Sequence, residues 1–285
     1  MAESRETNLW LYLAYDGSGY EGWQKQPHGR TVQNVLEQAL RELTGCELRT
    51  YGCGRTDRGV HADIYTVTVW LRGEARRLTE LGLPYWLHNL RHLLPTDIQL
   101  FSAHYLDGSH HARHTATRRQ YTLQAVYGEP APVRERHHVT VLRGAAEWVA
   151  MVRTLRGFIG HHDFTGIAVN DAGRSHVYSI EVRDHHGLRD GATRGRIDFR
   201  ITADRFLRRQ VRSMVGAAWE CGRGRLERER FLRIWHSGVR EPQLVSVGPQ
   251  GLSLTGLCYD FGWIWPPDHS THQKEDTPWC NVANL

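Results

Sequence analysis

The feature that most constrains the fold is the order in which strand-like and helix-like segments follow one another. In both halves of the chain, segments with alternating apolar residues stand close together, and only a few helical segments separate them. Strict alternation of strand and helix, which builds a parallel sheet, is not the pattern. The sequence therefore predicts an α+β fold of two similar lobes, each with an antiparallel sheet flanked by helices.

Turn residues and capping residues set the expected bounds of these segments. The clearest helix follows Thr31, which can cap it, and has apolar residues at helical spacing up to Leu43 before Gly45 ends it. Further helices are expected at residues 79–94, 145–158, 204–221 and 227–236, with Asp204 as a cap. Strands are expected at residues 9–15, 47–51, 64–70, 98–105, 120–126, 176–183, 196–201 and 252–259.

The lobes are expected at residues 1–107 and 108–262, with a tail at residues 263–285. We expect the first lobe to carry the loop with the candidate carboxylate and the second lobe to complete the site. The tail has no periodicity, and we expect it to be partly disordered or draped over the surface.

Composition narrows the class of protein. The formal net charge of +5 is compatible with a polyanionic partner, because Arg and Lys displace counterions from phosphates. Five scattered cysteines without a C-x-x-C pair indicate neither a disulfide framework nor a zinc site. Adjacent histidine pairs rarely chelate one ion, so no metal is expected. Without an apolar run long enough to cross a bilayer, a cytoplasmic location is expected.

The densest chemical signal is residues 52–62, where Gly52, Gly54 and Gly59 surround Arg55 and Asp57. Glycines permit a tight backbone path that presents both charged side chains outward. The loop fits two interpretations: a reactive carboxylate held between two strands, or a surface turn in which Asp57 only caps backbone amides. For the loop taken alone, the surface turn is favoured.

Several segments form a series of motifs along the chain: residues 15–24, 30–33, 54–57, 59–62, 94–98, 112–113, 119 and 121, 160 and 163–164, 206–208, 211–216 and 251–252. In sequence and in order, these motifs resemble those of the tRNA pseudouridine synthase A (TruA) family. The resemblance covers about residues 9–261, and several motifs in register make it specific. It implies the pseudouridine synthase fold, with an RNA-binding cleft between the lobes.

The resemblance also implies an activity and its partners. The expected reaction isomerises uridine to pseudouridine in the anticodon stem-loop of tRNA, at positions 38 to 40, without a metal or an organic cofactor. The family's enzymes are homodimers, so a homodimer is expected. Neither a membrane nor DNA is an expected partner.

Three catalytic residues are carried over by motif. Asp57 takes the place of the family's essential aspartate, either as a nucleophile on the sugar or as a base at C2'. Arg212 is implied to pair with Asp57 and hold it ionised. Tyr121 is implied to stack on the target base. On spacing alone, Arg212 would be an exposed helix arginine and Tyr121 a strand aromatic.

Substrate contacts are expected from four further residues. Arg55 resembles the arginine that fills the space left by the extracted uridine, Arg113 belongs to a phosphate-binding surface, and Leu252 lines the pocket. Arg58 departs from the family's usual alanine. It can crowd the pocket or point toward the RNA backbone, and we favour the backbone.

Two rival functions stay open on the sequence. A catalytically impaired RNA-binding or tRNA-folding protein of the same fold would follow if Arg58 blocked turnover, although Asp57, Tyr121 and Arg212 are retained together. A sugar-phosphate hydrolase is more distant, because no second acid accompanies Asp57 in its motif.

Overall fold

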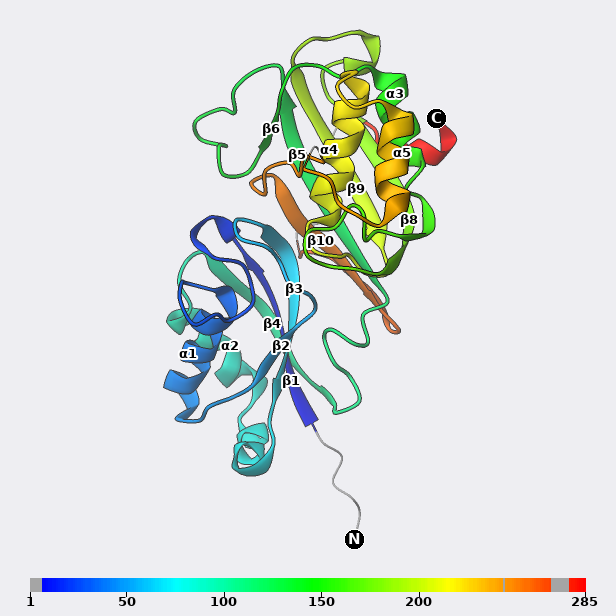
Figure 1. The fold of residues 1–285 in the computed structure, drawn as a ribbon. Coiled ribbons are helices and arrows are strands. Elements are labelled where there is room, and N and C mark those ends of the chain that lie inside the picture. The colour runs from blue at the N-terminus through cyan, green and yellow to red at the C-terminus, as the bar shows by residue number, and fades with distance from the viewer. Residues whose placement is uncertain (1–6, 243, 268–276) are drawn as a thin grey trace. The chain divides into compact units, whose positions relative to one another are not determined.

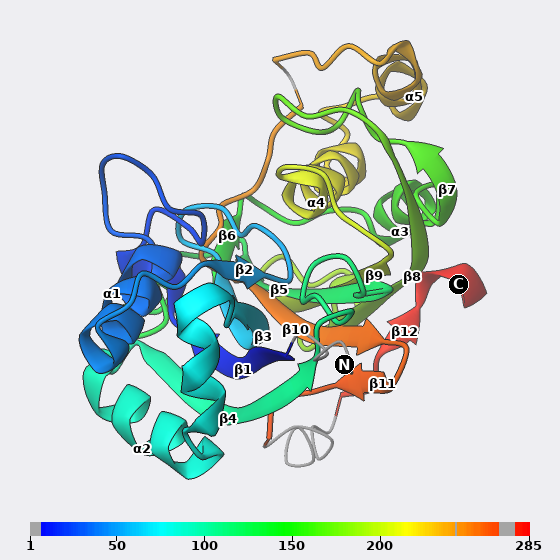
Figure 2. The same ribbon diagram turned by 90° about the horizontal axis from the view of Figure 1, so that it is seen from below.

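A computed structural model describes residues 7–242, 244–267 and 277–285 of the chain (Figures 1 and 2). The chain forms two compact units: residues 1–117 with 254–269, and residues 118–253 with 270–285. The sequence had suggested a boundary near residue 107 and a separate tail from residue 263. Both units combine antiparallel strands with helices, so the predicted α+β class is confirmed.

Long-range hydrogen bonds explain why residues 108–117 belong to the first unit. The Ala112 N–H donates to Oγ1 of Thr68 over 2.8 Å, and the Ala112 carbonyl accepts from the Tyr259 hydroxyl over 2.8 Å. The Thr117 N–H donates to the Cys258 carbonyl, also over 2.8 Å. Bonds to strands this distant in the chain leave no local signal, so sequence periodicity could not locate the boundary.

The strands of the first unit are largely those predicted. They are β1 (Thr7–Tyr15), β2 (Thr50–Gly52), β3 (His61–Trp70), β4 (Ile98–Asp107), β10 (Leu252–Tyr259), whose first two residues belong to the second unit, and β11 (Gly262–Ile264). They follow the order β10-β3-β1-β4, with β2 paired to β3 and β11 to β10. The expected strand at residues 47–51 is shorter than predicted, because only its last two residues and Gly52 pair with β3.

Two α-helices belong to the first unit, and both figures show them on the same side of its strands. Helix α1 (Val32–Thr44) is confirmed in detail: Oγ1 of Thr31 accepts from the Asn34 N–H, and Gly45 ends the helix at a φ of +69°. Its buried Leu36 and Leu40 lie one turn apart on one face, so packing against the unit stabilises the helix.

The helix expected at residues 79–94 begins later than predicted. Residues 73–80 form a 3₁₀ helix, and α2 (Leu83–Leu93) starts after Gly82, with Pro84 in its first turn. Proline lacks an N–H, so it fits a first turn and not the interior of a longer helix.

The strands of the second unit are β5 (Arg118–Tyr127), β6 (Thr140–Leu142), β7 (Gly160–Asp163), β8 (Arg174–Asp184), β9 (Gly195–Ala203) and β12 (Cys280–Asn281). They follow the order β12-β8-β9-β5, with β7 paired to β8 and β6 parallel to β5. The predicted strands at residues 120–126, 176–183 and 196–201 are confirmed.

The helices of this unit are α3 (Trp148–Arg156), α4 (Gln210–Gly222) and α5 (Arg228–Ser237). The prediction that Asp204 caps α4 is wrong, since α4 starts six residues later. Oδ1 of Asp204 instead accepts from the backbone N–H groups of His176 and Arg205. Helix α4 has twelve buried residues among its thirteen, Arg212 included.

The C-terminal segment is more ordered than expected where the structure describes it. Besides β11 and β12, it contains the fully buried Val282, whose carbonyl accepts from Nε of Arg156 over 2.9 Å. The Trp279 ring lies 4.2 Å from the Arg183 guanidinium and 3.9 Å from that of Arg200. The rest of the expected tail, residues 268–276, lies outside the described residues.

Among the described residues, no helix combines the length and apolar character needed to cross a membrane.

Candidate active site

The loop at residues 53–60, between β2 and β3, carries Asp57 in a tight turn. The Val60 N–H donates to the Asp57 carbonyl over 3.1 Å, which closes the turn three residues after the aspartate. On the other side, the Cys53 N–H donates to the Thr66 carbonyl over 3.0 Å and ties the start of the loop to β3. Asp57 itself is half-buried, so its carboxylate sits on an anchored backbone with partial access to solvent.

A second segment, residues 17–23, lies against this loop and holds it from one side. The Trp23 N–H donates to the Thr56 carbonyl over 3.2 Å, and the Gly59 N–H donates to the Tyr20 carbonyl over 3.3 Å. The hydroxyls of Tyr15 and Thr56 are 2.8 Å apart. The residue before Asp57 is therefore fixed by both its backbone and its side chain.

Gly22 permits this close approach. Its φ is +98°, a conformation that residues with a Cβ rarely adopt. A Cβ at this position would lie 2.4 Å from the Thr56 carbonyl oxygen and 3.2 Å from the Arg58 nitrogen. The glycine-rich segment is thus shaped to fit the backbone on both sides of Asp57.

The supporting segment is held in turn by Asp97. Its carboxylate accepts from the Tyr20 hydroxyl over 2.5 Å and from the Arg30 guanidinium over 2.8 Å, and Arg30 stacks on the Tyr20 ring at 4.2 Å. Burial, followed by the neighbouring Asp97 carboxylate, raises the pKa of Tyr20, so the phenol stays protonated as a donor.

Arg58 points its side chain into solvent. The side chain is 77% exposed, and its Nε lies 3.5 Å from the Glu21 carboxylate. An exposed ion pair of this kind contributes little to stability, so the guanidinium can exchange Glu21 for another anion at low cost.

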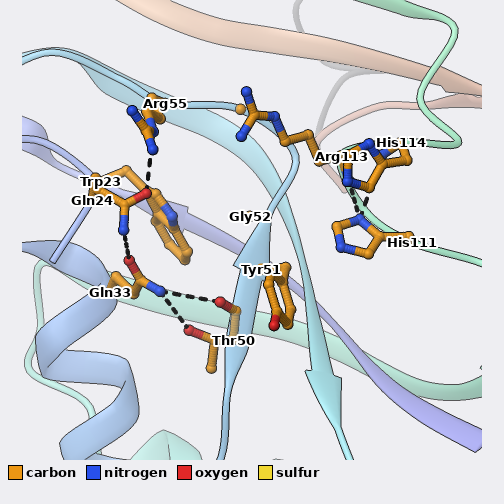
Figure 3. Close-up of a pocket in the computed structure, with 11 residues that line it drawn as sticks. Trp23, Gln24, Gln33, Thr50, Tyr51, Gly52, Arg55, His111, Arg113 and His114 are labelled. Atoms are coloured by element: carbon orange, nitrogen blue, oxygen red, sulfur yellow. Dashed lines mark hydrogen bonds between the residues drawn. The ribbon is translucent and has the colours of Figure 1, made fainter.

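Arg55 is oriented by a chain of side-chain amides, shown in Figure 3. Its Nε donates to Oε1 of Gln24 over 3.2 Å, and Nε2 of Gln24 donates to Oε1 of Gln33 over 2.8 Å. Gln33 is buried, and its Nε2 donates to the Thr50 carbonyl over 3.1 Å. The exposed Arg55 is thereby connected to the first strand that flanks the loop.

Arg55 also lines a pocket of about 270 Å³ in the first unit. The lining residues are Trp23, Gln24, Gln33, Thr50, Tyr51, Gly52, Gly54, Arg55, His111, Arg113 and His114 (Figure 3). Burial lowers the pKa of His111, and the neighbouring His114 and Arg113 lower it further. The pocket therefore combines cations at Arg55 and Arg113 with a neutral imidazole ring at ordinary pH.

Tyr121 lies on β5 opposite Ile201 of β9. Its ring meets the Phe206 ring edge to face, with the centroids 5.2 Å apart. The side chain is half-buried. The phenol ring is thus held by one aromatic neighbour.

Arg212 is 8% exposed, whereas spacing alone indicated an exposed arginine. Its Nε donates to the Val247 carbonyl over 2.7 Å, and the Val247 N–H donates to the Arg212 carbonyl over 3.2 Å. This reciprocal pair fixes the orientation of a buried guanidinium. Leu252, at the start of β10, is 5% exposed, and its N–H donates to the Pro249 carbonyl over 2.9 Å.

The first unit thus brings together Arg55, Asp57 and Arg58 on one loop, and places Arg55 and Arg113 on one pocket. The second unit carries Tyr121, Arg212 and Leu252. Sequence reasoning assigned no role to Gln24 and Gln33, although both occur in the motifs that carried the resemblance. It also missed Tyr51 and His111, because neither local pattern nor spacing connects them.

Comparison with known proteins gives consistent matches. A family model described as tRNA pseudouridine synthase matches residues 154–260. The tRNA pseudouridine synthase A 2 of Clostridium perfringens is 31% identical over 255 residues, which cover 88% of this chain and 99% of that protein. The tRNA pseudouridine synthase A of Gloeobacter violaceus is 33% identical over 267 residues, 90% of this chain and 82% of that protein.

A third relative, the tRNA pseudouridine synthase A of Chlorobium phaeobacteroides, is 32% identical over 260 residues, 88% of this chain and 93% of that protein. Each of these matches is longer than either unit alone, so each extends over both units. Since the identity is sustained over most of each relative, the chain belongs to the tRNA pseudouridine synthase A family.

Proposed function

We propose that this chain isomerises uridine to pseudouridine in the anticodon stem-loop of tRNA, at positions 38 to 40, with Asp57 as the reacting carboxylate. The observation that carries the proposal is the support of Asp57. A half-buried carboxylate stands in a closed turn, and the preceding residue is bound by Trp23 and Tyr15. Such anchoring suits a group that must meet a substrate atom in a defined geometry.

The reaction needs one carboxylate and conserves the atoms of the nucleoside. The C1'–N1 bond breaks, the uracil rotates, and a C5–C1' bond forms. The hydrogen on C5 then leaves as a proton, and N1 gains a proton. Asp57 acts either on the sugar as a nucleophile or at C2' as a base, and in both cases it must be ionised at the start.

Arg212 and Tyr121 complete the catalytic group in this proposal. A buried guanidinium is costly without an anion, and a carboxylate partner both satisfies it and favours the ionised carboxylate. Pairing of Arg212 with Asp57 would satisfy the guanidinium and keep the carboxylate ionised. Tyr121, packed against Phe206, stacks on the extracted uracil, and Leu252 contributes apolar surface to the same base.

The exposed arginines contact the RNA. Arg55 fills the space that the extracted uridine leaves, which offsets part of the cost of flipping. Arg58 and Arg113 bind phosphates and position the RNA without reading its sequence. We further propose that the protein acts in the cytoplasm as a homodimer that binds one RNA across both subunits. The reaction requires neither a metal nor an organic cofactor.

Tritium release tests the function directly. Transfer RNA labelled with tritium at uridine C5 is incubated with the protein, and the label released to water is counted. Release, with pseudouridine mapped to positions 38 to 40, supports the proposal. An RNA-binding protein without turnover releases no label, and a hydrolase liberates free uracil, so either result would contradict it.

A further inference from the structure

The pocket beside Arg55 has aromatic walls. The ring of Tyr51 lies 5.1 Å from the ring of His111, and Trp70 backs Tyr51 at 4.4 Å. His114 lies 4.4 Å from His111. Aromatic faces of this kind hold unstacked nucleobases in RNA-binding proteins without requiring a particular sequence.

The walls are held in place before any ligand binds. Nδ1 of His111 accepts the backbone N–H groups of Arg113 and His114, over 3.1 and 3.4 Å, so the imidazole plane is fixed. On the opposite part of the lining, Gln33 is bound to Thr50 and Gln24. A preformed site loses little conformational freedom on binding, which favours affinity.

The size and charge of the pocket narrow the choice of ligand. Small-molecule sites usually enclose roughly 300 to 1,000 Å³. A volume of about 270 Å³ is at the small end of this range and suits one planar ring system. Two exposed arginines, Arg55 and Arg113, line the same pocket and can meet phosphates. A nucleotide combines a planar base with phosphate, so it matches both the size of the pocket and its arginines.

The position of the pocket relates it to the reacting carboxylate. Arg55 precedes Asp57 by two residues, so their Cα atoms are at most about 7 Å apart. A stacked nucleic-acid strand rises about 3.4 Å per nucleotide, and an unstacked strand is longer. The pocket that Arg55 lines is therefore close enough to Asp57 to take a nucleotide near a uridine bound there.

We propose that this pocket binds the unstacked base of a nucleotide next to the target uridine. The base stacks on Tyr51 and His111, and Arg113 binds its phosphate, while Arg55 keeps the role proposed above and lines one side of the pocket. The proposal rests on the proposed function, because it takes the RNA to be bound with its target at Asp57. The pocket is then a second nucleoside site of the protein. By holding this base, it keeps the anticodon loop of the RNA open while the target uridine reacts.

The test couples changes in the protein to changes in the RNA. Anticodon stem-loop RNAs that carry an abasic nucleotide at one loop position at a time are titrated with the full-length protein by fluorescence anisotropy. The wild-type protein should lose about ten-fold in affinity at a position adjacent to the target, since stacking on one base is worth about 1 to 3 kcal/mol. The Tyr51→Leu variant should bind intact RNA about ten-fold more weakly and lose less than two-fold further at that position.

Controls separate stacking from loss of structure. Tyr85 is an exposed tyrosine on α2, and Tyr85→Leu should keep the ten-fold sensitivity to the abasic nucleotide. Circular dichroism monitors the fold of each variant. If Tyr51→Leu does not fold, His114→Ala removes an exposed ring of the same pocket and should show a smaller loss of sensitivity at the same position.

Two results would overturn the proposal. One is equal loss of affinity for wild type and variant at every abasic position. The other is that Tyr51→Leu loses sensitivity to an abasic nucleotide at the target position alone, which would mean that the pocket holds the reacting base. Tritium release from intact RNA is measured alongside. If tritium is released but Tyr51→Leu is as sensitive to the abasic nucleotide as wild type, the pocket proposal is refuted and the proposed function stands. If Tyr51→Leu loses that sensitivity but no tritium is released, the proposed function is refuted and the pocket is supported as an RNA-binding site.

Discussion

Gly22 packs directly against the carbonyl group of Thr56, the residue before Asp57. A Cβ on Gly22 would lie 2.4 Å from that carbonyl oxygen, well inside van der Waals contact. The two residues are 34 positions apart, and between them lies the whole of helix α1. The position of the Asp57 carboxylate thus depends on a glycine in a different segment of the chain.

Gly22→Ala should therefore impair both stability and turnover. Strain at a φ of +98° and the backbone clash together should lower the free energy of unfolding by about 2 kcal/mol or more. Turnover should fall at least about ten-fold, because small displacements of catalytic groups are costly. Urea denaturation and tritium release measure the two effects.

Gly45→Ala is the matched control. Gly45 also has a positive φ, +69°, but a Cβ there would have no heavy atom within 4 Å. It should cost about 1 kcal/mol of stability and leave turnover unchanged. Equal losses of turnover in both variants would mean that Gly22 acts only through general stability.

Gln24→Leu should lower kcat/KM several-fold by releasing Arg55. The Nε of Arg55 donates to Gln24, so the substitution frees the guanidinium to sample other orientations. A double-mutant cycle with Arg55→Ala provides the check. Gln24→Leu should add little to the effect of Arg55→Ala, and additive effects would show that Gln24 acts by another route.

Arg58→Ala should weaken RNA binding and leave kcat unchanged. The side chain is 77% exposed, so its loss removes about one phosphate contact and does not enlarge a pocket. The slope of log K against log salt should become shallower by about 0.7 to 0.9. Arg41→Ala, which removes another exposed ion-paired arginine, serves as the control. A rise in kcat for Arg58→Ala would instead indicate that Arg58 obstructs the site.

His111 should make stability fall on acidification. Its folded pKa is lowered from the model-compound value of 6.5, so below that pH the unfolded chain binds a proton that the folded protein does not. Stability is then lost as the pH falls from 6.5 toward the folded pKa. His111→Asn should reduce the slope of the free energy of unfolding against pH by up to about 1.4 kcal/mol per pH unit. An unchanged slope between pH 5.5 and 6.5 would contradict the assignment.

Local signals predicted the periodic elements well. Helix α1 was readable because Thr31, the apolar spacing and Gly45 all act within one segment. The start of α4 was not readable, since Asp204 is a good capping residue that instead bonds to the His176 backbone on β8. Whether a capping residue caps depends on its tertiary partners, which the local sequence does not reveal.

In the candidate site, too, local features could be predicted from the sequence and tertiary contacts could not. Glycine-rich sequence around Asp57 indicates a tight loop, but by itself that loop fits a surface turn better, and only the motifs elsewhere in the chain favour a reactive carboxylate. The pocket was not predictable, because Tyr51 and His111 are 60 residues apart and meet only in the folded unit. Nor did helical spacing indicate that Arg212 is buried, since that follows from α4 being enclosed on all sides.

Asp57→Asn tests the central claim most directly. Asparagine keeps the size of the side chain and can neither attack the sugar as a carboxylate nor remove a proton. With saturating tRNA labelled at uridine C5, the account predicts that tritium release falls to background while RNA affinity stays within a few-fold of wild type. Substantial residual release by a preparation shown to be free of deamidated protein would contradict the role assigned to Asp57.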